Sequence, residues 1–241
     1  MQSGRVLRRE DAMEKIKNIR KKLRHQRSVR RRKLGLSTPT QIICVSFIIV
    51  IALGTLLLTL PISSRHGRLD VLNAMFTATS ATCVTGLVVR DTWTQFTWFG
   101  QAVVLLLIQV GGLGLVTLTS FFALAMRRRM GFRDLRLLGE SVSADGYDQA
   151  KSVLKIVVGL AAMFEGIGIL LLLFAFVPQF GLEGVWISVF TAISAFCNAG
   201  FDLFGRFGAY SSLVPYVNNY YVQAVIMFMI ISGGLGFMVW V

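Results

Sequence analysis

The sequence predicts an all-helical protein that crosses a membrane several times and is built from a duplicated helical unit. Three observations lead to this fold class. Of the 241 residues, 54% are hydrophobic and only 15% are charged, a composition that excludes most soluble globular proteins. Several uncharged runs are long enough to cross a bilayer. In addition, positions 76–87 and 190–201 read FTATSATCVTGL and FTAISAFCNAGF, and share seven of twelve residues.

Four runs with at most one charged residue predict the membrane-spanning helices. Each approaches the length of about 20 residues that a crossing needs. The only charge inside them is Glu165, and an intramembrane carboxylate is by default a functional candidate. A structural pairing, or a neutral side chain hydrogen-bonded to a neighbour, explains it equally well. The runs are 42–60, 99–126, 156–177 and 220–241.

Charge decides the topology of the repeated stretches, 71–89 and 184–201. The first 33 residues contain fourteen Lys and Arg against three acidic residues, so the positive-inside rule places this tail in the cytoplasm. The arginines of 127–136 belong on the same side, which requires an even number of crossings between them and the tail. We therefore expect 71–89, and by repetition its copy, to enter the membrane and return.

Each re-entrant loop is predicted to contain a short helix, 73–82 or 188–196, that reaches about halfway into the bilayer. Extended backbone follows, and at membrane depth such backbone must be buried in protein or line a wet cavity. Its carbonyls suit a dehydrated cation on a pore axis. Gly86 and Gly200 are required if φ is positive there or if no Cβ fits. The predicted cation-binding backbone comprises Val84, Thr85, Gly86, Leu87, Asn198, Ala199, Gly200 and Phe201.

The motifs TSATCVTGL, SAFCNAGFDLFG and GGLGF resemble the Trk/Ktr/HKT superfamily of potassium transporters, most closely the bacterial Ktr/Trk membrane subunit. The resemblance implies four helix, pore-loop, helix units around one pore, with Gly86 and Gly200 in a selectivity filter that holds potassium by backbone carbonyls. It also implies a multipass protein of the cell membrane with no organic cofactor and no enzymatic activity. The partners it implies are a second copy and a cytoplasmic ring of nucleotide-binding regulatory subunits.

On this basis the chain divides into four parts. A basic cytoplasmic tail (1–38) precedes the first unit (39–126), and a cytoplasmic linker (127–152) with a turn at Asp145 and Gly146 leads to the second unit (153–241). Only two of the four expected units are present, so we expect a truncated chain. A two-unit protein that completes its ring by dimerisation is the alternative.

Two further features of the units have more than one interpretation. Asp91 and Asp202 are expected at the outer mouth, where carboxylates concentrate cations; the alternative is a solvated charge or an ion pair with Arg90 or Arg206. The glycine groups within 111–114 and 233–236 favour close helix packing or a gating bend. Three cysteines, Cys44, Cys83 and Cys197, are read as small buried residues.

The tail predicts a surface helix on anionic lipids, because apolar residues recur at near-helical spacing among its Lys and Arg. Nucleic-acid binding is not expected, since no aromatic side chains interleave those charges. Two other functions remain open. One is a sodium-permeable or non-selective cation transporter of the same fold, and the other is a membrane-anchored interaction protein that acts through its basic tail.

Overall fold

The computed structural model describes the backbone of residues 39–127 and 144–236, and the side chains of 44–114 and 155–236. The chain divides into two compact units, Met1–Ile48 and Ile49–Val241. All contacts discussed below lie within the second unit. The predicted lipid-binding tail and most of the predicted linker lie outside the described residues.

The described residues form helices and no strand, which confirms the predicted all-helical class. An isolated antiparallel bridge pairs Ser64 with Phe96. The α-helices are α2 (Pro39–Leu58), α3 (Val71–Thr82), α4 (Thr92–Gln95), α5 (Trp98–Arg127), α7 (Ala144–Phe180), α8 (Leu182–Phe196) and α9 (Tyr220–Gly234), and short 3-10 turns η1 (Pro61–Ser63), η2 (Phe204–Arg206) and η3 (Val214–Tyr216) lie in the loops.

Helices occupy all four ranges that the uncharged runs predict. For α5 the predicted and observed ends agree within one residue. Among the residues whose side chains are described, one helical segment, Lys155–Phe180 of α7, has the length and hydropathy to cross a bilayer. The last predicted helix, 220–241, is wrong in its end, because α9 ends at Gly234 with Leu235 as its C-cap, and Gly236 has φ of +76°. Residues 237–241 lie outside the described part of the chain.

The predicted turn at Asp145 and Gly146 is wrong, because α7 begins at Ala144 and contains both residues. The other end of α7 is a chain reversal at Gly181, which has φ of +62° and joins α7 directly to α8. A Cβ at Gly184 would lie 2.4 Å from the carbonyl oxygen of Phe176, so the two helices meet at backbone distance in this corner.

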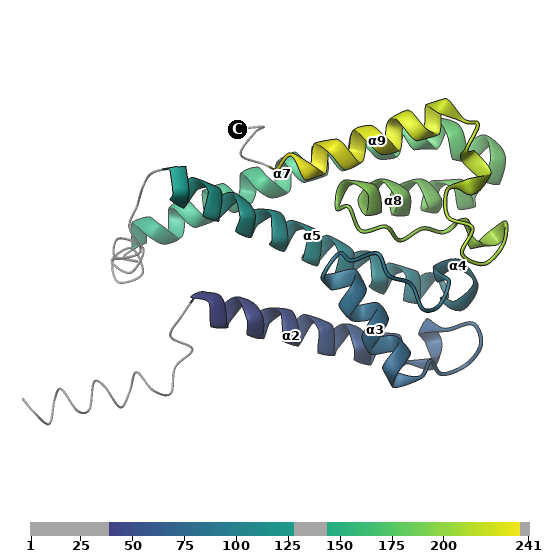
Figure 1. Cartoon of the computed structure of the whole chain (residues 1–241), viewed down its shortest axis with the longest axis horizontal. Coiled ribbons are helices and arrows are strands. Elements are labelled where there is room, and N and C mark those ends of the chain that lie inside the picture. The colour runs from purple at the N-terminus through teal and green to yellow at the C-terminus, as the bar shows by residue number, and fades with distance from the viewer. Residues whose placement is uncertain (1–38, 128–143, 237–241) are drawn as a thin grey trace, which may run out of the picture. The chain divides into compact units, whose positions relative to one another are not determined.

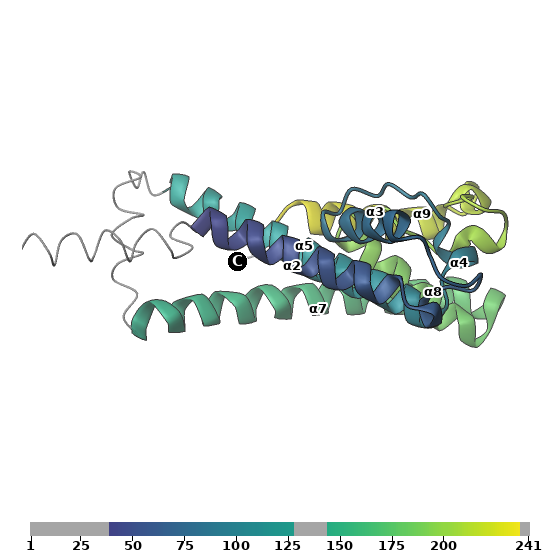
Figure 2. The same ribbon diagram turned by 90° about the horizontal axis from the view of Figure 1, so that it is seen from below.

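Helices α7, α8 and α9 pack against one another, while α5 contacts both α3 and α8. Figures 1 and 2 show α8 beside α9 and the short α3 against α5. Phe176 of α7, Phe204 of η2 and Tyr216 of η3 form a cluster with ring centroids 5.2 to 5.5 Å apart. This aromatic core fixes the loop after α8 over the ends of α7 and α9, and thereby positions the site.

Candidate functional site

Helices α3 and α8 end in the same hydrogen-bonded turn at equivalent positions of the repeat. The amide N–H of Thr85 donates to the carbonyl of Ser80 at 3.0 Å, and that of Ala199 donates to Ser194 at 2.8 Å. Val84 donates to Ala81 in the same way as its repeat equivalent, Asn198, donates to Ala195. This pair of bonds is a Schellman motif, which closes a helix C-terminus by turning the chain back.

The sequence predicts extended backbone directly after these helices. In the structure, the first residue of each predicted segment has a left-handed conformation instead. Val84 and Asn198 have φ of +56° and +58°, in the left-handed region that the Schellman motif requires at this position. Asn tolerates this region, whereas a β-branched Val is strained in it. The predicted ends of the short helices at Thr82 and Phe196 are confirmed.

Gly86 and Gly200 bring the two segments into backbone contact. Their φ values are +72° and +73°, a conformation that glycine adopts without steric cost. A Cβ on Gly86 would lie 3.0 Å from the carbonyl oxygen of Ala199, and one on Gly200 would lie 3.2 Å from the Cα of Gly86. The predicted positive φ is therefore confirmed, and a Cβ on either glycine would make a contact tighter than most real Cβ contacts.

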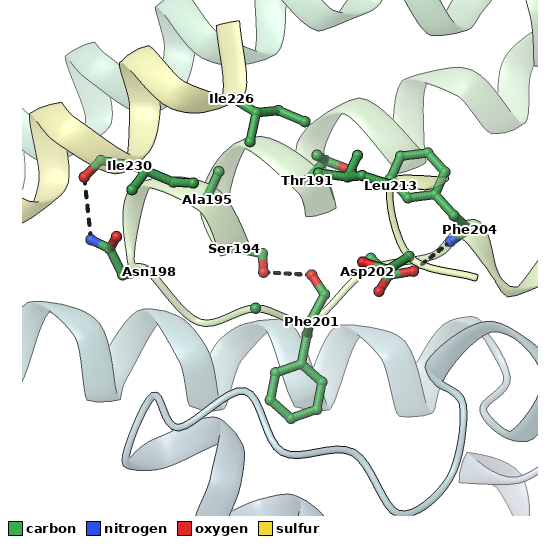
Figure 3. Close-up of a pocket in the computed structure, with 12 residues that line it drawn as sticks. Thr191, Ser194, Ala195, Asn198, Phe201, Asp202, Phe204, Leu213, Ile226 and Ile230 are labelled. Atoms are coloured by element: carbon green, nitrogen blue, oxygen red, sulfur yellow. Dashed lines mark hydrogen bonds between the residues drawn. The ribbon is translucent and has the colours of Figure 1, made fainter. Parts of the chain in front are cut away.

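The other predicted filter residues differ between the copies. Thr85 and Leu87 are exposed, whereas Ala199 and Phe201 are buried. The carbonyl oxygen of Phe201 accepts a hydrogen bond of 2.5 Å from Ser194 Oγ, which ties the segment to α8 (Figure 3).

Glycines on α5 and α9 support the ends of the short helices. A Cβ on Gly111 would lie 1.9 Å from the carbonyl oxygen of Thr82, and one on Gly233 would lie 1.8 Å from that of Phe196. These are equivalent contacts in the two copies. Close packing is thus confirmed for these glycines, and the gating bend stays a prediction.

Asp91 is buried and joins the two loops that follow the paired segments. Its Oδ1 accepts hydrogen bonds from the amide and hydroxyl of Thr94 at 2.8 and 2.9 Å, so it caps α4. Its Oδ2 accepts the amide N–H of Tyr210 at 3.1 Å. In the described part of the chain no ion pair joins Asp91 to Arg90 or Arg206; Arg206 pairs with Glu183 at 3.1 Å.

Asp202 is half-buried in the loop after α8, and its Oδ1 accepts the amide N–H of Phe204 at 2.9 Å. Burial raises the pKa of this carboxyl, and the charge of Asp91 raises it further, while the Phe204 amide and Ser212 oppose the shift. On acidification Asp202 therefore loses its charge at a higher pH than an exposed aspartate does. Its predicted position at an outer mouth stays a prediction.

We expect Asp91→Ala to lower the free energy of unfolding by about 1–2 kcal/mol, because it removes a helix cap and leaves the Tyr210 amide unpaired. Thermal unfolding of the detergent-purified protein measures the loss. Asp70→Ala is the matched control, since Asp70 occupies the N-cap of α3 without a side-chain hydrogen bond. Equal midpoints for the two variants would contradict the role assigned to Asp91.

Glu165 is buried on α7 and pairs with Gln109 of α5. The Gln109 Nε2 donates to both carboxylate oxygens at 2.9 and 3.1 Å, and its Oε1 accepts a contact from Cys197 Sγ at 3.9 Å. This hydrogen bond to an uncharged neighbour agrees with both structural interpretations of Glu165, a pairing or a neutral side chain, and the role of Glu165 in the ion path stays untested. Of the three cysteines expected to be buried, only Cys197 is; Cys83 is half-buried and Cys44 is exposed.

Sequence reasoning missed the glutamines that link the elements. Gln101 is fully buried; its Nε2 donates to the carbonyl of Phe96 at 3.2 Å and its Oε1 accepts Trp186 Nε1 at 2.8 Å. Its repeat equivalent, Gln223, donates to the carbonyl of Tyr216 at 3.1 Å. The repeated Gln-Ala-Val motif was the available signal, because a polar residue retained in two apolar runs needs a partner.

Within the described residues no group of three His, Cys, Asp or Glu side chains is placed to hold a metal ion. The oxygen atoms that the paired segments offer belong mainly to the backbone. Carbonyl oxygens bind monovalent cations by replacing hydration water.

Comparison with known proteins agrees with this chemistry. The profile of the TrkH family, described as "Cation transport protein", matches residues 13–241. The chain is 38% identical over 205 residues to the potassium/sodium uptake protein NtpJ of Enterococcus hirae, an alignment that covers 84% of this chain and 44% of that protein. It is 40% identical over 203 residues to the Ktr system potassium uptake protein B of Bacillus subtilis, with the same two coverages. The chain thus spans less than half the length of these relatives.

Proposed function

Since this chain belongs to the TrkH family of cation transport proteins, we propose that it supplies two pore loops to a potassium uptake protein of the cell membrane. Potassium would move down its electrochemical gradient past the backbone carbonyls of 84–87 and 198–201. The observation that carries this proposal is the contact between Gly86 and Gly200, which have the same left-handed conformation at equivalent repeat positions.

The lengths of the short helices support a re-entrant course for each loop. Helix α3 has 12 residues and α8 has 15, which at 1.5 Å per residue gives about 18 and 22 Å. The hydrocarbon core is about 30 Å thick, so each helix is shorter than the core; the described part of α9, also 15 residues, is too, and the re-entrant course rests on the charge argument as well. The C-termini of α3 and α8, where the partial negative charge of the helix dipole lies, adjoin the paired segments. This field favours a cation at the segments over an anion.

The remaining assignments of the proposal follow the predicted domain boundaries. Residues 39–126 and 153–241 would each be one helix, pore-loop, helix unit, and 1–38 and 127–152 would be cytoplasmic. A homodimer, a nucleotide-binding regulatory ring and anionic lipids at the basic tail are the proposed partners. Two relatives from Bacillus subtilis are named as proteins of a Ktr system, which supports a transporter with further components.

Sodium permeability is the second candidate function, because the Enterococcus hirae relative is named a potassium/sodium uptake protein. Both candidate functions, potassium uptake and sodium permeability, can be tested in potassium-uptake-deficient bacteria that express the full open reading frame. The measurement is the uptake of rubidium and of sodium. We expect saturable rubidium uptake that potassium competes for more strongly than sodium does. Equal competition by both ions would favour the sodium-permeable alternative.

Deletion of residues 1–33 separates transport from action through the basic tail. The transport proposal predicts that uptake per inserted protein persists. Loss of all uptake on this deletion, at unchanged membrane abundance, would favour the interaction-protein alternative. Uptake of neither ion by abundant wild-type protein would contradict the proposal itself.

A further inference from the structure

A cavity of about 200 Å³ lies behind the second paired segment, between that segment, α8 and α9 (Figure 3). Ile226 and Ile230 line it from α9. Its polar lining comprises Thr191, Ser194, Asn198, Asp202 and Ser212. Polar groups thus line the cavity on the side of the segment and α8, together with the apolar Ala195, Phe201, Phe204 and Leu213, while α9 contributes apolar side chains only.

Thr191 gives the first reason to expect a ligand in this cavity. The residue is 5% exposed, and its Oγ1 has no hydrogen-bond partner within the described part of the chain. Its repeat equivalent Thr77, in the same Phe-Thr-Ala motif, donates its hydroxyl to the carbonyl of Asn73 at 2.9 Å. A buried hydroxyl without a partner is costly. Of the two equivalent threonines, Thr77 has a protein partner and Thr191 has none among the described residues; Thr82, which is not among the residues that line the cavity, is also without one there.

Asp202 gives the second reason. The equivalent position of the first copy is Val88, so only the second copy has a carboxylate beside its cavity. The Phe204 amide donates to one oxygen of Asp202, and the Ser212 side chain also hydrogen-bonds to this carboxylate. A carboxylate offers about four acceptor sites, so sites remain for a ligand. Burial raises the pKa of this carboxyl, while its hydrogen bonds with the Phe204 amide and Ser212 oppose the shift.

The size and chemistry of the cavity suit water. A water molecule occupies about 30 Å³ and needs two to four polar partners, and this cavity has room for several. We propose that a cluster of ordered water molecules fills it, bridges the Thr191 hydroxyl to the Asp202 carboxylate, and thereby holds the second paired segment against α8. The effect on transport rests on the proposed function, whereas the water site itself does not.

Thr191→Val tests the bridge because it keeps the side-chain shape and removes the hydroxyl. If water bonds to the hydroxyl, the variant loses an interaction and its unfolding midpoint falls. If the cavity is dry, the variant removes an unpaired group and the midpoint rises or stays unchanged. Thr77→Val is the matched control, since its hydroxyl bonds within its own helix. Thr191→Ser keeps the hydroxyl but removes a buried methyl group, so its readout is the potassium-over-sodium preference, which should stay at the wild-type value.

Two further measurements on the full-length protein complete the test. High-resolution density should show water peaks within hydrogen-bond distance of Thr191 and Asp202; a side chain or lipid chain in the cavity would overturn the proposal. In uptake assays Thr191→Val should lower potassium-over-sodium preference about fivefold, as expected for one hydrogen bond, while Thr77→Val should not. If the wild type transports nothing, the proposed function fails, and midpoint and density still decide the water site.

Discussion

Replacing Gly200 by serine will abolish rubidium uptake or admit sodium. The backbone at this residue has φ of +73°, and a side chain in that region costs about 1–2 kcal/mol. The new Cβ would also lie 3.2 Å from the Cα of Gly86, so one segment must move away from the other. Cation binding by carbonyls depends on their placement, and we expect at least about a tenfold loss of uptake or of selectivity.

The control for this substitution is Gly67→Ser. Gly67 also has positive φ, +88°, but a Cβ there meets no atom within 4 Å. The Gly67→Ser substitution therefore introduces similar backbone strain without a close contact to another segment. This variant should keep the potassium-over-sodium preference of the wild type. The reciprocal variant Gly86→Ser should behave as Gly200→Ser does. If Gly200→Ser matches Gly67→Ser in uptake and preference at equal membrane abundance, the paired segments are not the filter.

Replacing Gly233 by alanine will also reduce uptake, because the substitution destabilises the folded protein. Its Cβ would lie 1.8 Å from the carbonyl oxygen of Phe196, a separation that non-bonded atoms do not reach, so α9 must move away from the end of α8. Overpacking of this kind costs about 1–3 kcal/mol. We expect a lower unfolding midpoint and at least about a fivefold loss of uptake. The equivalent variant Gly111→Ala meets the carbonyl of Thr82 at 1.9 Å.

The adjacent residue provides the control. A Cβ on Gly234 has Asn198 Nδ2 at 3.8 Å as its nearest contact, so Gly234→Ala should keep both the midpoint and the uptake of the wild type. Unfolding midpoints and membrane abundance separate loss of fold from loss of transport. Identical behaviour of the two alanine variants would contradict the support that we assign to Gly233.

The sequence by itself determined the features that depend on neighbouring residues along the chain. Uncharged runs located α2, α5, α7 and α9, because a long apolar stretch is read from consecutive residues. The repeat located the ends of α3 and α8 at Thr82 and Phe196, since each copy supplies independent evidence for the same boundary. It also singled out Gly86 and Gly200, although the reason for a glycine was left conditional.

Only the tertiary structure decided which of the alternative uses each residue has. Asp91 is a helix cap that reaches Tyr210, and Glu165 pairs with Gln109, yet neither partner is marked in the sequence. Thr77 and Thr191 occupy identical motifs, but only the first bonds within its helix. A polar side chain satisfies its hydrogen bonds with whatever lies nearest in space, and packing, which joins residues far apart in the chain, determines that neighbour.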